Sequence, residues 1–213
     1  MATARTAGLV VAIAAASVYF AVGREWLLPK PPSPWPPVVG ELYPDIVLLD
    51  HAGRKVAISD FRGKVVLIEP VGVPCAACQA WSGGHRVGGF GGVQPQENLP
   101  AFEEMISQYA GISVDHPDLV VVQILMFDLT ATHAPSMEEA ANWARHFGLD
   151  EESDNVHVLV GDARFTGRAS YDLIPGFQVV DRDGVLVVDA AGHDAPSDVY
   201  REAMPRLGEL VGQ

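Results

Sequence analysis

The sequence predicts an α/β fold in which a central mixed sheet is flanked by helices and carries an N-terminal β-hairpin extension. The continuous apolar run 65–68 and the largely apolar run 119–126 have the pattern of strands that are buried on both faces. Helix-like segments follow both runs, as crossovers between parallel strands require. Near the C-terminus, apolar residues 177–180 and 185–188 surround Asp-Arg-Asp-Gly, which is typical of a hairpin turn. With 213 residues, 48% of them hydrophobic, the chain is long enough for one domain with its own core.

The first half of the domain begins with a second hairpin. Its strands are expected at 46–49 and 55–58, on either side of a glycine-containing turn. The buried strand at 65–68 leads into a helix expected at 75–81. Six glycines within 83–92 cut this helix short, because glycine is a poor helix former.

The second half continues the alternation of strands and helices. Ser136 and Glu139 have the pattern of a capping box, which opens a helix that ends at Gly148. Pro205 is expected to kink or split the last helix, because proline has no N–H to donate. The other elements of this half are expected as helices at 100–109 and 197–210 and as strands at 119–126, 156–160, 177–180 and 185–188.

The N-terminal residues differ in kind from the rest. Residues 7–22 form an uncharged apolar run with Arg5 before it and Arg24 after it. The run is short for a membrane span, which needs about 17–25 residues. It is long for the apolar region of a cleaved signal, which has about 7–15 residues. We favour an uncleaved membrane anchor; a signal cleaved near 21–23, which would give a secreted protein, and a buried helix are the alternatives.

These observations divide the chain into three parts. Residues 1–28 are the membrane anchor or signal segment, and the proline-rich residues 29–37 form an extended linker. Residues 38–213 form the domain, which an anchor or a signal would place in the periplasm or elsewhere outside the cytoplasm. The net charge of -13 excludes nucleic acid as a partner, because phosphate binding requires a basic surface.

The two cysteines of the chain, Cys75 and Cys78, lie in the segment Val-Pro-Cys-Ala-Ala-Cys. They are expected at a strand-to-helix junction, where residues i and i+3 share one face of the first helical turn. The free N–H groups at a helix N-terminus stabilise a thiolate, and the thiolate is the species that attacks disulfides. A pair so placed is close enough to form a disulfide, so the spacing indicates thiol–disulfide chemistry.

Further motifs extend this interpretation along the domain. Tyr43-Pro44-Asp45 and the run Ile-Ser-Asp-Phe-Arg-Gly-Lys at 58–64 precede the strand into the CxxC, and Ile174-Pro175-Gly176-Phe177 follows about a hundred residues later. The types and order of these motifs resemble those of proteins with the thioredoxin fold, and more narrowly those of the membrane-anchored TlpA/ResA-like redoxins. The resemblance covers about 40–210. It implies a thioredoxin-like fold for the domain.

The same resemblance implies roles for individual residues. Cys75 matches the nucleophile and Cys78 the resolving cysteine, which releases the reduced substrate. Pro175 matches a cis-proline that would place the Ile174 backbone opposite the CxxC, where a substrate strand can pair with it. An ordinary trans proline is the alternative. Pro74 stands where these proteins usually carry tryptophan; we include it in the substrate-binding surface, although it supplies no flat aromatic ring and no N–H.

Glu69 lies six positions before Cys75, where many thioredoxins carry a buried aspartate. Burial would raise the pKa of its carboxyl, which could then accept the proton of the Cys78 thiol during resolution. A glutamate that faces solvent at the strand end is the alternative. The dipeptide Ala76-Ala77 and the glycine-rich segment 83–92 depart from the family. We interpret the latter as a flexible rim of the substrate site or, equally, as a plain surface loop.

Together these features predict a membrane-anchored thiol–disulfide oxidoreductase that exchanges disulfides with exported proteins. Its partners would be protein dithiols or disulfides and a second redox protein that donates or accepts electrons. No cofactor and no metal ligand is expected. A Sco-like copper chaperone is one alternative, since two thiolates suit copper, but 169–175 contains no histidine. A thiol peroxidase is another, but Gly72 stands where peroxiredoxins carry a hydroxyl.

Overall fold

A computed structural model describes residues 35–150 and 155–212. The chain divides into the units Met1–Pro31 and Pro32–Gln213, and the described residues belong to the second. The predicted anchor or signal at 1–28 lies outside the described residues, as does most of the predicted linker at 29–37. Within the described part, no helix has both the length and the hydropathy needed to cross a membrane.

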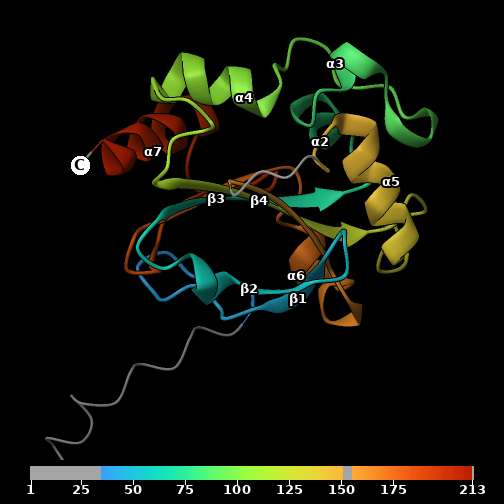
Figure 1. Cartoon of the computed structure of the whole chain (residues 1–213), viewed down its shortest axis with the longest axis horizontal. Coiled ribbons are helices and arrows are strands. Elements are labelled where there is room, and N and C mark those ends of the chain that lie inside the picture. Colours follow the sequence, from blue (N-terminus) through green and yellow to red (C-terminus); the bar gives the residue numbers. More distant parts are fainter. Residues whose placement is uncertain (1–34, 151–154, 213) are drawn as a thin grey trace, which may run out of the picture. The chain divides into compact units, whose positions relative to one another are not determined.

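Among the described residues, seven strands form one mixed sheet (Figure 1) in the order β2-β1-β5-β4-β3-β6-β7. β3 is parallel to β4 and β4 to β5, whereas the other neighbouring pairs are antiparallel. This arrangement confirms the predicted mixed sheet and the N-terminal hairpin, which is β1 with β2. The strands are β1 (Val47–Asp50), β2 (Lys55–Ala57), β3 (Val65–Gly72), β4 (Leu119–Phe127), β5 (Val156–Val160), β6 (Gly176–Val180) and β7 (Leu186–Ala191).

Helices flank the sheet on both sides, as expected. In Figure 1, α2, α4 and α7 lie on one side of β3 and β4, and α6 lies on the other. The α-helices are α2 (Ala76–Trp81), α3 (Gly84–Val87), α4 (Phe102–Met105), α5 (Met137–Phe147), α6 (Arg168–Tyr171) and α7 (Met204–Val211). Shorter 3-10 or π-helical segments are η1 (Ile58–Phe61), η2 (Phe90–Gly92), η3 (Ile106–Ala110), η4 (Ala163–Phe165) and η5 (Val199–Ala203).

β3 is longer than predicted. The expected strand ended at Ile68, but the structure continues it through Pro70 to Gly72. Pairing with β6 stops at Ile68, whereas pairing with β4 continues to the end of the strand. Pro70, which has no backbone N–H to donate, therefore lies beyond the last residue of β3 that pairs with β6. This explains why a proline is tolerated in a central strand.

The predicted capping box of α5 is only half present. The Ser136 side chain accepts the backbone N–H of Glu139 at 3.1 Å, and α5 ends before Gly148, whose φ is +70°. The Glu139 carboxylate, however, accepts the N–H of Leu129 at 2.9 Å. The prediction of a reciprocal box was wrong because this carboxylate caps the loop before the helix instead. Pro205 splits the last helix as expected, since η5 ends and α7 begins just before it.

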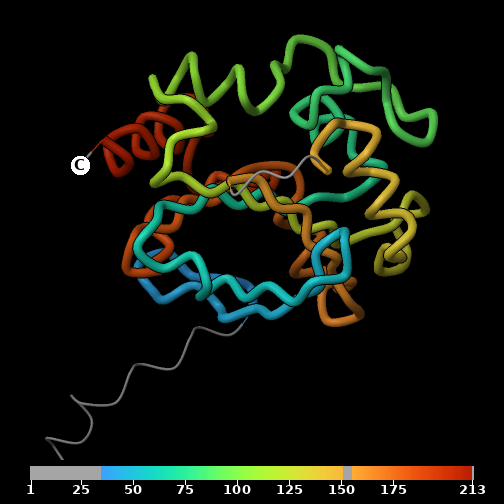
Figure 2. Tube along the Cα trace, in the orientation of Figure 1, coloured from blue at the N-terminus to red at the C-terminus, as the bar shows by residue number. Residues whose placement is uncertain are grey.

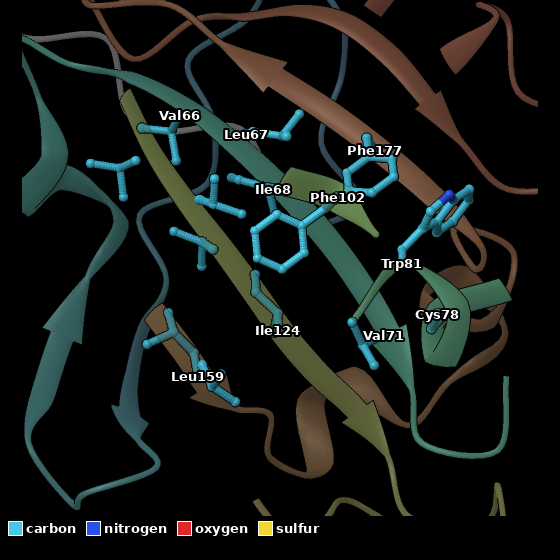
Figure 3. Packing of buried hydrophobic residues seen from close by; sticks show 14 of the residues in the cluster. Val66, Leu67, Ile68, Val71, Cys78, Trp81, Phe102, Ile124, Leu159 and Phe177 are labelled. Carbon is cyan, nitrogen blue, oxygen red and sulfur yellow. The ribbon is translucent and has the colours of Figure 1, made fainter. Parts of the chain in front are cut away.

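The hydrophobic core fixes the helix that carries the cysteines. Figure 3 shows Leu67 of β3 and Ile124 of β4 in one cluster with Phe102 and Phe177. Trp81, at the end of α2, joins this cluster, and its ring centroid lies 4.7 Å from that of Phe177. Burying an aromatic ring of this size contributes about 1.5–3 kcal/mol. α2 is thereby held against the sheet from its C-terminal end.

The predicted linker touches the domain at its C-terminal end. Trp35 Nε1 donates to Ser170 Oγ at 2.9 Å, and its ring packs edge-on against Phe165 with centroids 4.9 Å apart. These contacts hold Trp35 against α6 and the segment before it.

Candidate active site

Cys75 occupies the N-cap position of α2, at the junction that follows β3. Its backbone N–H donates to Gly72 O at 2.9 Å, which fixes the tight connection between strand and helix. Its Sγ accepts the backbone N–H of Cys78 at 3.2 Å. A hydrogen bond from the Cys78 thiol, together with the N–H groups of Cys78 and Ala77, lowers the pKa of Cys75 against the opposing effect of partial burial. Cys75 is half-buried and is the more acidic of the two thiols.

Cys78 lies one turn further on and is fully buried at the edge of the core (Figure 3). Both cysteines are free thiols in this structure. Burial raises the pKa of Cys78 well above its usual value, and its hydrogen bond to Cys75 and the charges of Cys75 and Glu69 raise it further. The helix thus presents one accessible, acidified thiol and one buried, protonated thiol.

Glu69 is fully buried in β3, so the alternative of a solvent-facing glutamate does not apply. Burial raises the pKa of its carboxyl well above the usual value; a hydrogen bond from Gln123 opposes this, and the charge of Cys75 adds to it. Gln123 Nε2 donates to Oε2 at 2.8 Å, while Oε1 is buried with no hydrogen-bond partner among the described residues. The carboxyl therefore has one fixed oxygen and one open oxygen.

An open pocket of about 290 Å³ lies at Cys75. It includes all three residues predicted to bind substrate: Pro74 on the cysteine side, and Ile174 and Pro175 across from it. The Ile174–Pro175 peptide bond is cis, as expected. The lining is largely apolar and consists of Gly72, Pro74, Cys75, Ala76, Ala77, Gln96, Phe127, Ala131, Tyr171, Ile174, Pro175 and His193.

Ile174 and Cys75 both lie close to Gly72, at the end of β3. A Cβ placed on Gly72 would lie 3.6 Å from Ile174 Cδ1 and 3.8 Å from Cys75 Cβ. Gly176, directly after Pro175, has a φ of +148°, and a Cβ there would lie 2.2 Å from Ala190 O. Only glycine fits at this second position, and it lets β6 start directly after the cis-proline.

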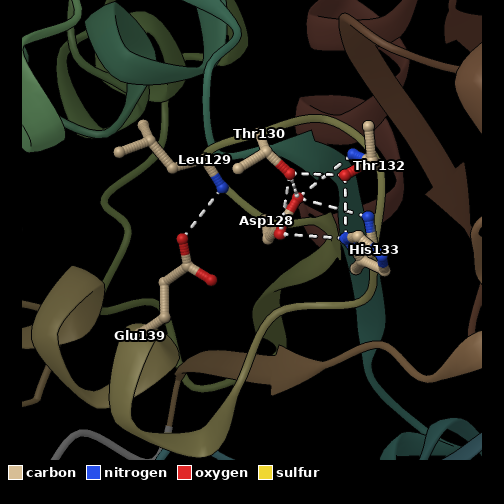
Figure 4. A network of polar contacts seen from close by, with 6 residues as sticks. All are labelled: Asp128, Leu129, Thr130, Thr132, His133 and Glu139. Atoms are coloured by element: carbon tan, nitrogen blue, oxygen red, sulfur yellow. Dashed lines mark hydrogen bonds and ion pairs between the residues drawn. The ribbon is translucent and has the colours of Figure 1, made fainter.

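One wall of the pocket is a loop that the sequence analysis did not identify. The Asp128 carboxylate accepts hydrogen bonds from the hydroxyl of Thr130 and from the backbone N–H groups of Thr132 and His133, at 2.8–3.2 Å (Figure 4). Ala131, at the tip, has a positive φ of 58° and lines the pocket. Asp128 thus holds the loop in a turn that supports this wall.

The glycine-rich segment after α2 is not a simple loop, since it contains α3 and η2. Buried Gln79 ties it to the active site: its Nε2 donates to Val73 O at 2.7 Å and to Phe90 O at 3.2 Å, and its Oε1 accepts the Phe90 N–H at 2.7 Å. His146 of α5 contacts Gly88 O at 2.9 Å, and Figure 2 shows this segment beside α5. Of this region, it is Gln96, beyond the glycines, that lines the pocket.

Sequence reasoning missed the partners of Glu69. Gln123 and Ser82 are both fully buried, and Trp143 joins them through its indole N–H. One available signal was overlooked: Gln123 interrupts an otherwise apolar strand, as Glu69 does. The described residues contain no group of three or more His, Cys, Asp or Glu side chains placed to hold a metal ion.

No known family model and no curated protein sequence matches the chain. Its structure is similar to a candidate protein disulfide isomerase from Bacteroides thetaiotaomicron, with 16% identity, a TM-score of 0.53, and coverage of 84% of this chain and 92% of that chain. A candidate electron transfer protein from Aquifex aeolicus VF5 has 14% identity and a TM-score of 0.53, with 81% and 92% covered. The thioredoxin domain of a thiol–disulfide oxidoreductase from Bacteroides vulgatus has 17% identity and a TM-score of 0.47, with 80% and 98% covered. The chain has the predicted thioredoxin-like fold.

Proposed function

We propose that this protein is a thiol–disulfide oxidoreductase that works through Cys75 and Cys78. The observation that carries the proposal is the difference between the two thiols. One is acidified and faces an open pocket, and the other is buried within one helical turn of it with a raised pKa. An accessible thiolate next to a protected thiol suits attack followed by intramolecular resolution.

The reaction has two steps. First, Cys75 Sγ attacks a substrate disulfide, so that a mixed disulfide forms and the other substrate sulfur leaves as a thiolate. Next, Cys78 loses its proton and attacks Cys75 Sγ, which forms the Cys75–Cys78 disulfide and releases the second substrate thiolate. The substrate gains two electrons and the protein loses two; the reverse sequence oxidises a dithiol.

Glu69 is proposed to accept the Cys78 proton in the second step. Cys78 needs such a base because burial holds its pKa high. Glu69 suits the role because burial raises the pKa of its carboxyl, which makes it a stronger base than an exposed glutamate, and because its Oε1 has no hydrogen-bond partner among the described residues. The charge of Glu69 also contributes to the raised pKa of Cys78, which supports this role.

The pocket is proposed to bind an extended substrate segment through Pro74, Ile174 and Pro175. The Ile174 N–H already donates to Tyr171 O at 3.1 Å, so the Ile174 carbonyl is the group left to pair with a substrate backbone. Phe127 and Tyr171 make this surface apolar. A protein segment with apolar side chains beside its cysteine suits such a lining better than a charged one.

Location and partners are proposed from the sequence alone. Residues 1–28 would anchor the chain in a membrane, with the domain in the periplasm or otherwise outside the cytoplasm, as in the TlpA/ResA-like redoxins. Exported proteins would be the substrates, and a second redox protein would donate or accept the electrons. Alkaline extraction of membranes that contain the full chain is expected to leave it in the pellet; recovery in the supernatant would contradict anchoring.

Trapping of the mixed disulfide tests the proposed reaction. Cys78→Ser removes the resolving thiol, so this variant is expected to accumulate a Cys75-linked adduct with a disulfide-bonded model protein such as insulin. Cys75→Ser is the matched control and is expected to form none. The proposal fails if Cys78→Ser gives no adduct, or if Cys75→Ser gives the same adduct.

A further inference from the structure

We propose that Gln123 is a positioning residue for Glu69, and that Trp143 fixes the orientation in which Gln123 does this. The inference deepens the proposed function and rests on it. Glu69 and Gln123 are direct partners in the parallel pairing of β3 with β4 (Figure 1), so their side chains leave the same face of the sheet. Both are fully buried.

The orientation of the Gln123 amide follows from its neighbours. Trp143 Nε1 lies 3.0 Å from Gln123 Oε1, and an indole N–H can only donate. The oxygen of the amide must therefore face Trp143, and its NH₂ group must face the opposite way. There it donates to Glu69 Oε2 and to Ser82 Oγ, both at 2.8 Å. No flipped amide satisfies Trp143, so the donor on Glu69 is fixed.

This arrangement has a chemical consequence for Glu69. Gln123 holds Oε2 and leaves Oε1 free to take a proton. A hydrogen bond from a neutral amide also stabilises the carboxylate and so opposes the rise in the pKa of Glu69 caused by burial. Gln123 thereby favours the ionised carboxylate, which is the form that can accept a proton.

The groups around Glu69 are few. Cys75 and Cys78, at the start of α2, interact with it electrostatically. β4 contributes Gln123, and α5 contributes Trp143, both uncharged. On the other side of β3, β6 places uncharged residues opposite 66–68. Ser82 closes the network at the other end of α2, where its N–H donates to Cys78 O at 3.0 Å. Gln123 is thus the partner whose removal leaves the carboxylate without a donor in this network.

Stopped-flow reaction of the reduced full chain with dithiobisnitrobenzoate separates the two chemical steps. Attack by Cys75 releases one nitrothiobenzoate, and resolution by Cys78 releases the second. At high reagent concentration the second release reports resolution, the step that requires Glu69. In Gln123→Met we expect the pH midpoint of this phase to move up and its rate at pH 7 to fall about tenfold, which corresponds to loss of a hydrogen bond worth about 1.4 kcal/mol. The first phase is expected to change less than about twofold.

Two further variants keep the test decisive. Trp143→Phe removes the N–H that orients the amide and is expected to shift the second phase in the same direction, which also covers the case that Gln123→Met does not fold. Gln178→Met is the matched control: this glutamine is equally buried and bonds Tyr43 and Asp189, not Glu69. It is expected to leave the second-phase midpoint unchanged.

Separate results overturn the separate ideas. An unchanged midpoint in the folded variants of Gln123 and Trp143 would overturn the positioning role and leave disulfide exchange intact. The positioning role would also be overturned if Gln123→Met still shifted the midpoint in a Glu69→Gln background, because the effect of Gln123 would then not act through Glu69. Release of only one nitrothiobenzoate by the wild type would overturn the proposed function itself.

Discussion

Gln79→Met is expected to destabilise the protein by about 2–4 kcal/mol, because methionine keeps the volume of a buried side chain but none of its hydrogen bonds. Gln79 is fully buried, and its amide makes three bonds, to Val73 O and to the N–H and carbonyl of Phe90. A buried hydrogen bond contributes about 1 kcal/mol, and a buried backbone group left without a partner costs about 1–3 kcal/mol. The substitution leaves such groups both on the strand-to-helix connection before Cys75 and in the glycine-rich segment.

Urea denaturation followed by circular dichroism measures this loss directly. Gln94→Met provides the matched control, since Gln94 is an exposed glutamine in the same segment of chain. Its substitution is expected to change the free energy of unfolding by less than about 0.5 kcal/mol. The reasoning is refuted if Gln79→Met costs no more than Gln94→Met, because the amide would then not join the segment to the active site.

Three further predictions follow from the same geometry. The pH midpoint for alkylation of Cys75 is expected below the value of about 8.5 for a free thiol. It should rise in Cys78→Ala, because this substitution removes the hydrogen bond that lowers the pKa of Cys75 most. Equal midpoints in the two proteins would contradict this prediction. Gly176→Ala is expected to lower the free energy of unfolding by more than about 3 kcal/mol, since the added Cβ would meet the backbone of β7. Gly53 also has a positive φ but has open space around it, so Gly53→Ala should lower the free energy of unfolding less. Thermal unfolding of both variants measures the difference. The folded protein holds the Glu69 proton more tightly than the unfolded chain, so stability should fall as pH rises from about 4.5 towards the raised pKa of Glu69. In Glu69→Gln, the free energy of unfolding measured by urea titration should differ less between pH 5 and pH 8 than in the wild type. An equal difference in the two proteins would show that Glu69 is not buried as described.

Local patterns in the sequence were sufficient for much of the fold. The hairpins, the buried strands, the CxxC helix and the end of α5 at Gly148 depend on neighbours a few residues apart, and the structure contains all of them. The cis bond before Pro175 was expected from a family resemblance. The end of β3 was not predicted correctly. It depends on where pairing with β6 stops, and the sequence of β3 alone does not contain that information.

The site shows the same division. Cys75 and Cys78 were predicted from one short segment. The burial of Glu69 was favoured over exposure to solvent partly because of the family resemblance. The pairing of Glu69 with Gln123 requires the register of two strands 54 residues apart in sequence. The pocket likewise brings together Phe127 from the end of β4, Tyr171 from the end of α6 and His193 from the segment after β7. Such convergence is set by tertiary packing, which periodicity and local motifs do not encode.

The central claim is that Cys75 and Cys78 are a working dithiol–disulfide couple. A redox titration of the protein in thiol–disulfide buffers, read by alkylation and mass spectrometry, tests it most directly. We predict a reversible two-electron transition between about -120 and -300 mV, in which both thiols disappear together. Thiols that never pair reversibly, or a protein that is isolated with copper on the two cysteines, would contradict the claim.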